Sequence, residues 1–260
     1  MSKKKGKHFD SKKEINQEEK KIKIPFFFII SIIITIICIA YIIKWATESN
    51  YNKEVLEKAH ESVVVETVNE EPQIVSVDFD NLKETNSETV GWIKVNNTEI
   101  DFPVVQAKDN DYYLRHSFDK SYNIAGWIFM DYRVKRDGTD KNTTIYGHNM
   151  KNGTMFTSLK NILNEEWYSN EDNLKVTYID EKGIHLYQVF SIYQIEKETY
   201  YTNTDFNSNA EFENFINTIK GRSKVDFGIE VGIEDQILTL STCANNNNYR
   251  VVLHAKKIEK

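Results

Sequence analysis

The sequence predicts a mainly β protein: an eight-stranded β-barrel, preceded by N-terminal helices and a single transmembrane helix, with one helix between its sixth and seventh strands. Three observations predict this fold class. Short apolar runs of strand length recur from Val90 onward. Two stretches among them have helical periodicity instead. Near the N-terminus, an uncharged run is long enough to cross a bilayer.

A transmembrane anchor is expected over residues 24–43, which are uncharged and consist mostly of Ile and Phe. At about 1.5 Å per residue, such a helix spans roughly 30 Å, the thickness of the hydrocarbon core of a bilayer. This length argues against a buried helix of a soluble domain. The run also exceeds the roughly 7–15 residues of a signal-peptide core, and its small-residue cleavage motif, Cys38–Ala40, is weak. An uncleaved anchor is therefore favoured over a signal peptide.

The distribution of charge orients this anchor. Nine Lys precede the apolar run, whereas only Lys44 lies close behind it. The positive-inside rule then predicts a cytoplasmic Lys-rich tail at residues 1–23 and a body outside the cell membrane. Residues 45–260 carry 23 basic and 35 acidic side chains, a balance of −12. An acidic body of this kind predicts that the protein has no nucleic-acid partner.

The chain outside the membrane divides at Pro72 into two expected parts. Residues 44–72 have neither Gly nor Pro before Pro72, and they predict a helical stalk or N-terminal extension. Residues 73–260 are expected to form the barrel domain. Its strands are predicted at 90–95, 99–105, 124–130, 143–146, 174–179, 184–195, 236–242 and 251–258, and its helices at 154–163 and 210–220.

The composition agrees with a folded core. The chain has 260 residues, of which 40% are hydrophobic and 28% charged, with only three Pro and ten Gly. These values exclude a chain that is disordered throughout, a collagen-like repeat and a disulfide-rich mini-protein.

The two cysteines differ in what they indicate. Cys38 lies inside the apolar run and is expected to act there as a small apolar residue. Cys243 is then the single thiol of the external body, where an exposed thiol is open to oxidation. It ends a predicted strand just before a polar loop, and strand alternation places it on one face with Thr239 and Ser241. The position suggests a nucleophile, although a buried, inert cysteine remains an alternative.

Arg250 and His148 are the candidate partners of that thiol. If the strands around the polar loop pair as a hairpin, Arg250 lies near Cys243, where a guanidinium favours a thiolate and can stabilise an oxyanion. A surface Arg that caps the strand is the alternative. Among the six His, His148 ranks first because it stands where an apolar strand opens into a polar loop through Gly147. A lone His is nevertheless more often structural than catalytic.

Taken together, these residues resemble a known family. Thr239-Leu-Ser-Thr-Cys243, with Arg250 downstream and Tyr146-Gly-His148 upstream, resembles the sortases, which are membrane-anchored cysteine transpeptidases of Gram-positive bacteria. The resemblance covers roughly residues 75–260. The Ser within the Thr-Leu-Ser-Thr-Cys motif, the N-terminal extension and the predicted helix at 210–220 resemble class B in particular.

The resemblance implies a sortase-type barrel as the catalytic domain and a specific reaction. Cys243 would attack the Thr carbonyl of a sorting signal near the C-terminus of a surface protein. The resulting thioester would pass to a peptidoglycan precursor amine. His148 would transfer protons and Arg250 would steady the peptide and the oxyanion. Asn110 and Leu114 resemble residues that line the class B groove. Tyr146, Ser241, Tyr200 and Tyr201 would shape the same groove.

The expected partners are surface proteins with a signal of the Asn-Pro-x-Thr type or a related one, the peptidoglycan amine, and the membrane. No cofactor or metal is expected, because the sequence has no P-loop, GxGxxG or HExxH motif and no paired Cys for zinc. Three alternatives remain open: a sortase that polymerises pilins, a papain-type peptidase, and a non-enzymatic membrane-anchored binding module.

Overall fold

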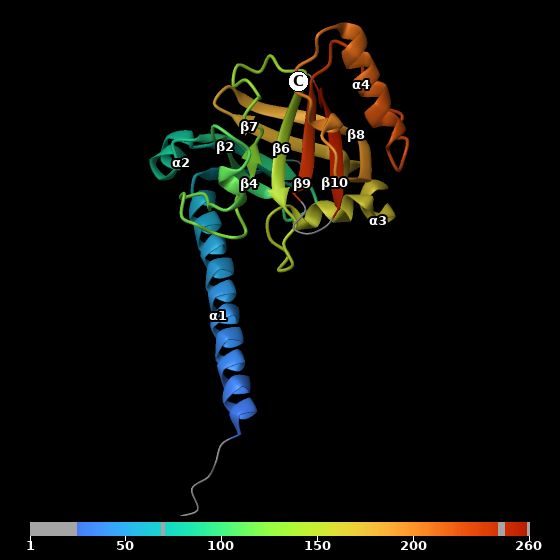
Figure 1. Cartoon of the computed structure of the whole chain (residues 1–260). Coiled ribbons are helices and arrows are strands. Elements are labelled where there is room, and N and C mark those ends of the chain that lie inside the picture. Colours follow the sequence, from blue (N-terminus) through green and yellow to red (C-terminus); the bar gives the residue numbers. More distant parts are fainter. Residues whose placement is uncertain (1–24, 69–70, 244–247, 259–260) are drawn as a thin grey trace, which may run out of the picture. The chain divides into compact units, whose positions relative to one another are not determined.

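The computed structural model describes residues 25–68, 71–243 and 248–258, and it forms two compact units that divide between Lys44 and Trp45. In Figure 1 the helices and strands are coloured along the chain, from blue near the N-terminus to red near the C-terminus. The tail expected at residues 1–23, and the loop at 244–247, lie outside the described residues.

The long N-terminal helix α1 (Phe26–His60) begins in the first unit and ends in the second. Its apolar part has a mean hydropathy of 3.0 over 18 residues, and none of that window is buried. By length and composition, α1 can cross a membrane. Within the second unit, α1 carries Asn52, whose buried Oδ1 accepts hydrogen bonds from Ser117 Oγ at 2.7 Å and Asn123 Nδ2 at 2.9 Å.

A two-stranded sheet follows α1 where a helical extension was expected. The helix ends at His60, and β1 (Val63–Val68) pairs antiparallel with β2 (Glu71–Val77). Three consecutive β-branched residues at the start of β1 favour an extended backbone over a helix. Pro72 therefore lies within a strand, opposite Thr67, where an isolated two-stranded sheet tolerates it. The short helix α2 (Phe79–Thr85) comes next, capped by the Asp78 carboxylate.

Eight strands then close a barrel in the order β10-β8-β7-β3-β4-β5-β6-β9. The β4–β5 and β6–β9 pairs are parallel, and the other neighbours are antiparallel. The eight-stranded, mainly β fold is confirmed. The strands are β3 (Thr89–Val95), β4 (Asp101–Val105), β5 (Phe129–Met130), β6 (Asn142–His148), β7 (Lys175–Asp180), β8 (Gly183–Glu196), β9 (Ile237–Cys243) and β10 (Tyr249–Ile258).

Two apolar clusters stabilise this barrel. Its interior holds fully buried side chains such as Trp92, Trp127 and Leu240. The second cluster lies on the outer wall, where the helix α4 (Asn209–Gly221) packs Phe215 and its neighbours on β8 and β10. Figure 1 shows α4 beside β8. As expected, this helix stands between the sixth and seventh barrel strands.

Two predicted elements differ from the structure. The strand expected over 124–130 shrinks to β5, because Gly126 adopts a φ of +58° and its N–H closes a turn onto the Asn123 carbonyl. The helix expected over 154–163 is a 3₁₀ helix, η2 (Phe156–Leu163). The remaining short helices are η1 (Tyr112–Leu114), α3 (Glu165–Tyr168), η3 (Glu171–Leu174) and η4 (Tyr200–Thr202).

Candidate active site

The parallel pairing of β6 and β9 brings two of the predicted catalytic positions together. His148 is the register partner of Cys243, and Tyr146 is the partner of Ser241. The strands run in the same direction, so their carboxyl ends meet at one edge of the sheet. The two residues that sequence analysis placed at strand ends therefore terminate neighbouring strands.

Arg250 lies on the other side of β9, on β10. In this antiparallel pair Val252 stands opposite Ser241, and the Val251 N–H donates to Thr242 Oγ1 at 3.0 Å. Arg250 lies two residues before Val252 and Cys243 lies two residues after Ser241, so both stand just beyond this paired stretch, at the same end of β9 and β10. The Arg250 side chain is half-buried, and its Nη1 donates to the Tyr249 carbonyl at 3.2 Å. Three adjacent strands thus carry the three predicted catalytic residues.

The loop before β5 covers His148, which is only 5% exposed. Its Nε2 lies 2.9 Å from the carbonyl oxygen of Leu114, the last residue of η1. Because a carbonyl oxygen can only accept, Nε2 carries a hydrogen, and Nδ1 is the ring nitrogen on the other side of the imidazole. Leu114, predicted as a groove residue, therefore contacts His148 through its backbone.

Two glycines allow other segments to approach His148 closely. A Cβ on Gly126 would collide with the carbonyl oxygen of Tyr113 and would lie 3.0 Å from His148 Cδ2. A Cβ on Gly147 would lie 2.5 Å from the Phe156 ring, on the opposite side of the β6 backbone from His148. Sequence analysis singled out Gly147 and missed Gly126, since an isolated glycine in an apolar run gives no sign of which side chain it faces.

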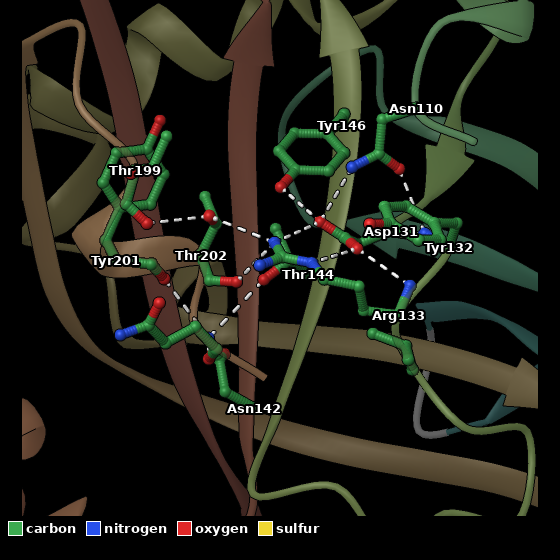
Figure 2. A network of polar contacts seen from close by, with 12 residues as sticks. Asn110, Asp131, Tyr132, Arg133, Asn142, Thr144, Tyr146, Thr199, Tyr201 and Thr202 are labelled. Atoms are coloured by element: carbon green, nitrogen blue, oxygen red, sulfur yellow. Dashed lines mark hydrogen bonds and ion pairs between the residues drawn. The ribbon is translucent and has the colours of Figure 1, made fainter. Parts of the chain in front are cut away.

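A buried carboxylate lies beside the groove residues predicted on β6 and before β5. Asp131 directly follows β5 and is 0% exposed. Its Oδ2 accepts hydrogen bonds from Tyr146 OH at 2.8 Å and Asn110 Nδ2 at 3.0 Å. Figure 2 shows these side chains converging on Asp131. The structure thus joins two predicted residues, Asn110 and Tyr146, through a third that sequence analysis missed.

Arg133 completes this cluster. Its Nε donates to Asp131 Oδ1 at 2.9 Å, and its Nη2 donates to Oδ2 at 2.7 Å and to the Thr202 carbonyl at 2.9 Å (Figure 2). Burial raises the pKa of Asp131, but the bonds from Arg133 and Tyr146 outweigh it and hold that pKa below its usual range. Burial and the nearby carboxylate raise the pKa of Tyr146. Asp131 is therefore a carboxylate, and Tyr146 a neutral donor, at neutral pH.

The two tyrosines of η4 that were predicted to shape the groove, Tyr200 and Tyr201, contact different parts of the barrel. The Tyr201 hydroxyl is hydrogen-bonded to Ser241 Oγ at 3.0 Å, and both residues are buried. The Tyr200 ring packs on Phe215 of α4 and under the guanidinium of Arg222. The structure thus brings Tyr201 to the wall of β9, whereas Tyr200 joins the outer apolar cluster.

A buried polar chain holds β10, β9 and β6 together below these residues. Tyr193 OH lies 2.8 Å from His254 Nε2, and Thr239 Oγ1 lies 2.8 Å from His254 Nδ1. Thr239 donates its own hydrogen to Asn142 Oδ1 at 2.6 Å, so it accepts the hydrogen of Nδ1. Complete burial, helped by the charge of Arg222, lowers the pKa of His254 to about 3. A neutral His254 therefore links Tyr193 on β8 to Thr239 on β9.

Other features of the described residues lie away from this site. A cavity of about 340 Å³ is lined by residues such as Asp140, Gln236 and Lys257, which stand at the opposite ends of β6, β9 and β10 from His148 and Cys243. In the part of the chain that the structure describes, no group of three or more His, Cys, Asp or Glu could hold a metal ion.

Comparisons with known proteins identify the family of the chain. The family model of the Sortase domain matches residues 93–258. The chain is 35% identical over 222 residues to Sortase B of Listeria monocytogenes, covering 82% of this chain and 87% of the relative. It is 30% identical over 241 residues to Sortase B of Staphylococcus aureus, covering 90% and 97%.

Solved structures give the same result. The chain resembles sortase B from B. anthracis in complex with AAEK1, with a TM-score of 0.72 and 36% identity, covering 82% of this chain and 99% of that one. It also resembles a Staphylococcus aureus sortase B–substrate complex, with a TM-score of 0.66 and 33% identity, covering 70% and 84%.

Proposed function

The chain belongs to the sortase family, in class B, and we propose that it cleaves the C-terminal sorting signal of surface proteins after Thr and joins that Thr to a cell-wall peptide amine. The observation that carries this proposal is the register of β6 on β9, which makes His148 and Cys243 backbone partners. A His and a Cys at paired backbone positions on adjacent strand ends are the residue types that nucleophilic catalysis requires.

In the first half of the proposed reaction, Cys243 acts as the nucleophile. Its sulfur attacks the Thr carbonyl while the thiol hydrogen passes to Nδ1 of His148, the nitrogen left unprotonated by the bond from Nε2 to Leu114. The C–N bond then breaks, a thioester forms, and His148 returns the proton to the departing amine. The C-terminal tail of the substrate leaves.

In the second half, an amine from a cell-wall peptide attacks the thioester. His148 takes a proton from that amine, a new amide bond forms as the thioester C–S bond breaks, and the proton passes from His148 to the departing sulfur, which restores the Cys243 thiol. Arg250, at the same end of the β9–β10 pair as Cys243, would donate hydrogen bonds to the tetrahedral oxyanion and to the sorting peptide in both halves. Asn110, Tyr146, Ser241 and Tyr201 are the residues we expect along the groove.

We also propose that α1 anchors the enzyme, with its N-terminus in the cytoplasm and the barrel outside the cell. The support is the apolar length of α1 and the nine Lys that precede it. Tethering enzyme and substrate to one membrane raises their effective concentration for each other.

The test uses the full-length chain in detergent micelles. It is mixed with peptides of the Asn-Pro-x-Thr, Ser-Pro and Pro-Pro types and with either a cell-wall-type amine or a peptide whose amine is a Lys side chain, and both cleavage and joining are followed by mass. We expect cleavage after Thr and joining to the cell-wall amine. Joining to the Lys peptide alone would establish the pilin-polymerising alternative instead, and no cleavage of any peptide would overturn the proposal.

Two single-cysteine variants test the nucleophile. Cys243→Ala is expected to abolish both cleavage and joining, because no other residue supplies the sulfur. Cys38→Ala is the matched control, since Cys38 lies within the apolar part of α1, and it is expected to keep wild-type rates. Equal activity of the two variants would remove Cys243 from the mechanism.

A further inference from the structure

Asp131 connects three separate segments around the groove. Through Oδ2 it binds Asn110, in the loop before η1, and Tyr146, on β6. Through Arg133 it reaches the carbonyl of Thr202 in η4. Figure 2 shows Asn110 and Tyr146 meeting at this carboxylate, and Thr202 meeting Arg133. Two backbone donors add to the cluster: the Arg133 N–H to Asp131 and the Tyr132 N–H to Asn110.

We propose that Asp131 is a positioning residue for the sorting peptide, because its buried carboxylate sets the relative positions of the groove walls that carry Asn110, Tyr146 and Thr202. The inference rests on the proposed function, and it assigns roles to Asp131 and Arg133 as a pair. Neither is expected to touch the reacting atoms.

The location of the cluster supports this role. Tyr146 precedes His148 by two residues on β6, as Ser241 precedes Cys243 on β9, so these pairs share one face of the sheet. Two strand residues span roughly 6.5 Å, about the length of two residues of an extended peptide. The walls that Asp131 joins therefore stand where residues next to the scissile bond would lie.

The chemistry of the cluster is also better suited to orienting neighbouring side chains than to raising the free energy of unfolding. Asp131 is 0% exposed, whereas the Arg133 side chain is 39% exposed. Removing a charge from water is unfavourable, and replacing a buried ion pair by apolar residues is often neutral or stabilising. A carboxylate that accepts five hydrogen bonds, by contrast, defines the direction of every donor around it.

The loop held by Asn110 continues directly to the residue that orients His148. Leu114 lies four residues after Asn110, and its carbonyl accepts the hydrogen of His148 Nε2. The Asp109 carboxylate accepts the N–H groups of Asp111 and Tyr112, so the turn between the two residues is itself hydrogen-bonded. Asp131 thus fixes one end of this segment. The hydrogen-bonded turn holds the Leu114 end, so the loss of Asp131 is expected to affect the binding of the peptide more than the imidazole.

The test measures kcat, KM and thiol reactivity in the full-length chain. Asp131→Asn keeps the volume of the side chain but replaces an acceptor oxygen by a donor nitrogen. Arg133→Lys keeps the charge but loses the fork that joins Asp131 to Thr202. In both variants KM for the sorting peptide is expected to rise about fivefold or more, with kcat within about threefold of wild type. Alkylation of Cys243 by iodoacetamide, which needs no groove, is expected to stay within about twofold.

Asp101→Asn is the matched control, because that carboxylate also accepts hydrogen bonds within the barrel, from Trp92 Nε1 at 2.6 Å and Lys94 Nζ at 3.0 Å. It is expected to leave KM and alkylation unchanged. A KM within twofold of wild type in both Asp131→Asn and Arg133→Lys overturns the inference, and so does an equal fall in peptide turnover and alkylation. If the wild-type chain turns over no sorting peptide while Cys243 alkylates, the proposed function fails, and the inference fails with it.

Discussion

His148 donates its Nε2 hydrogen to the carbonyl oxygen of Leu114, 2.9 Å away. The bond joins the end of β6 to η1, a segment more than 30 residues earlier in the chain. In a neutral ring, this bond selects one tautomer and so decides which nitrogen can take up a proton. The position of the backbone around Leu114 is therefore part of the proposed proton-transfer machinery.

Gly126→Ala tests that dependence. The added Cβ would collide with the Tyr113 carbonyl and crowd His148 Cδ2, so it would displace both partners of the bond between Leu114 and the ring. We expect kcat/KM for a sorting peptide to fall about tenfold or more, since small displacements of a catalytic group have large effects on rate.

Gly153→Ala is the control for this prediction. Gly153 also has a positive φ, +85°, but a Cβ there meets nothing within 4 Å. Both variants should lose about 1 kcal/mol or more in the free energy of unfolding, measured by denaturant titration. Equal kcat/KM values for the two variants would show that crowding at His148 has no effect.

Arg250→Lys tests the role of the guanidinium. A Lys ammonium keeps the charge but cannot donate two parallel hydrogen bonds from a planar fork. We expect kcat/KM to fall about tenfold or more, whereas Arg136→Lys, at the cavity on the opposite end of the barrel, should change it by less than twofold. Both values are obtained by following peptide cleavage by mass. Full activity of the Arg250→Lys variant would exclude Arg250 from the mechanism.

His254 predicts a pH dependence of stability. In the folded chain its pKa is lowered to about 3 from the ordinary histidine value of 6.5. Between these values the unfolded chain binds a proton that the folded chain does not, so the free energy of unfolding falls as the pH falls. From pH 7 to pH 5, the protonation of His254 in the unfolded chain lowers the free energy of unfolding by about 2 kcal/mol.

In the variant His254→Gln, the free energy of unfolding should not show this fall between pH 7 and pH 5. Although the substitution lowers stability at pH 7 by disturbing the bonds with Tyr193 and Thr239, the difference between the two chains should narrow by about 2 kcal/mol at pH 5. Urea unfolding at the two pH values measures it. A constant difference would mean that His254 has the same pKa in both states.

The sequence predicts the strands and their ends more reliably than it predicts the connections between them. Alternating apolar residues locate most barrel strands because burial on one face imposes a period of two. The positions of His148 and Cys243 at strand ends follow from the same pattern. Their pairing with each other could not be predicted from it, because β6 and β9 are neighbours only through the tertiary structure.

The features that were missed depend on contacts with distant residues. Asp131 follows an apolar run like many surface acids, and only its neighbours Asn110 and Tyr146 distinguish it. The β1–β2 sheet has Glu, Gln and Ser among its Val residues, a composition also compatible with a helix or a loop. The local propensity of such a segment cannot decide between strand, helix and loop, because packing against distant residues overrides it.

The parallel contact of β6 with β9 has a consequence for biosynthesis. About ninety residues separate the two strands along the chain, and β9 and β10 are the last strands to complete the barrel. During synthesis, His148 is therefore made long before Cys243. In the proposed mechanism, the enzyme becomes competent only when β9 and β10 complete the barrel, so an incomplete chain would not form a thioester with a passing polypeptide.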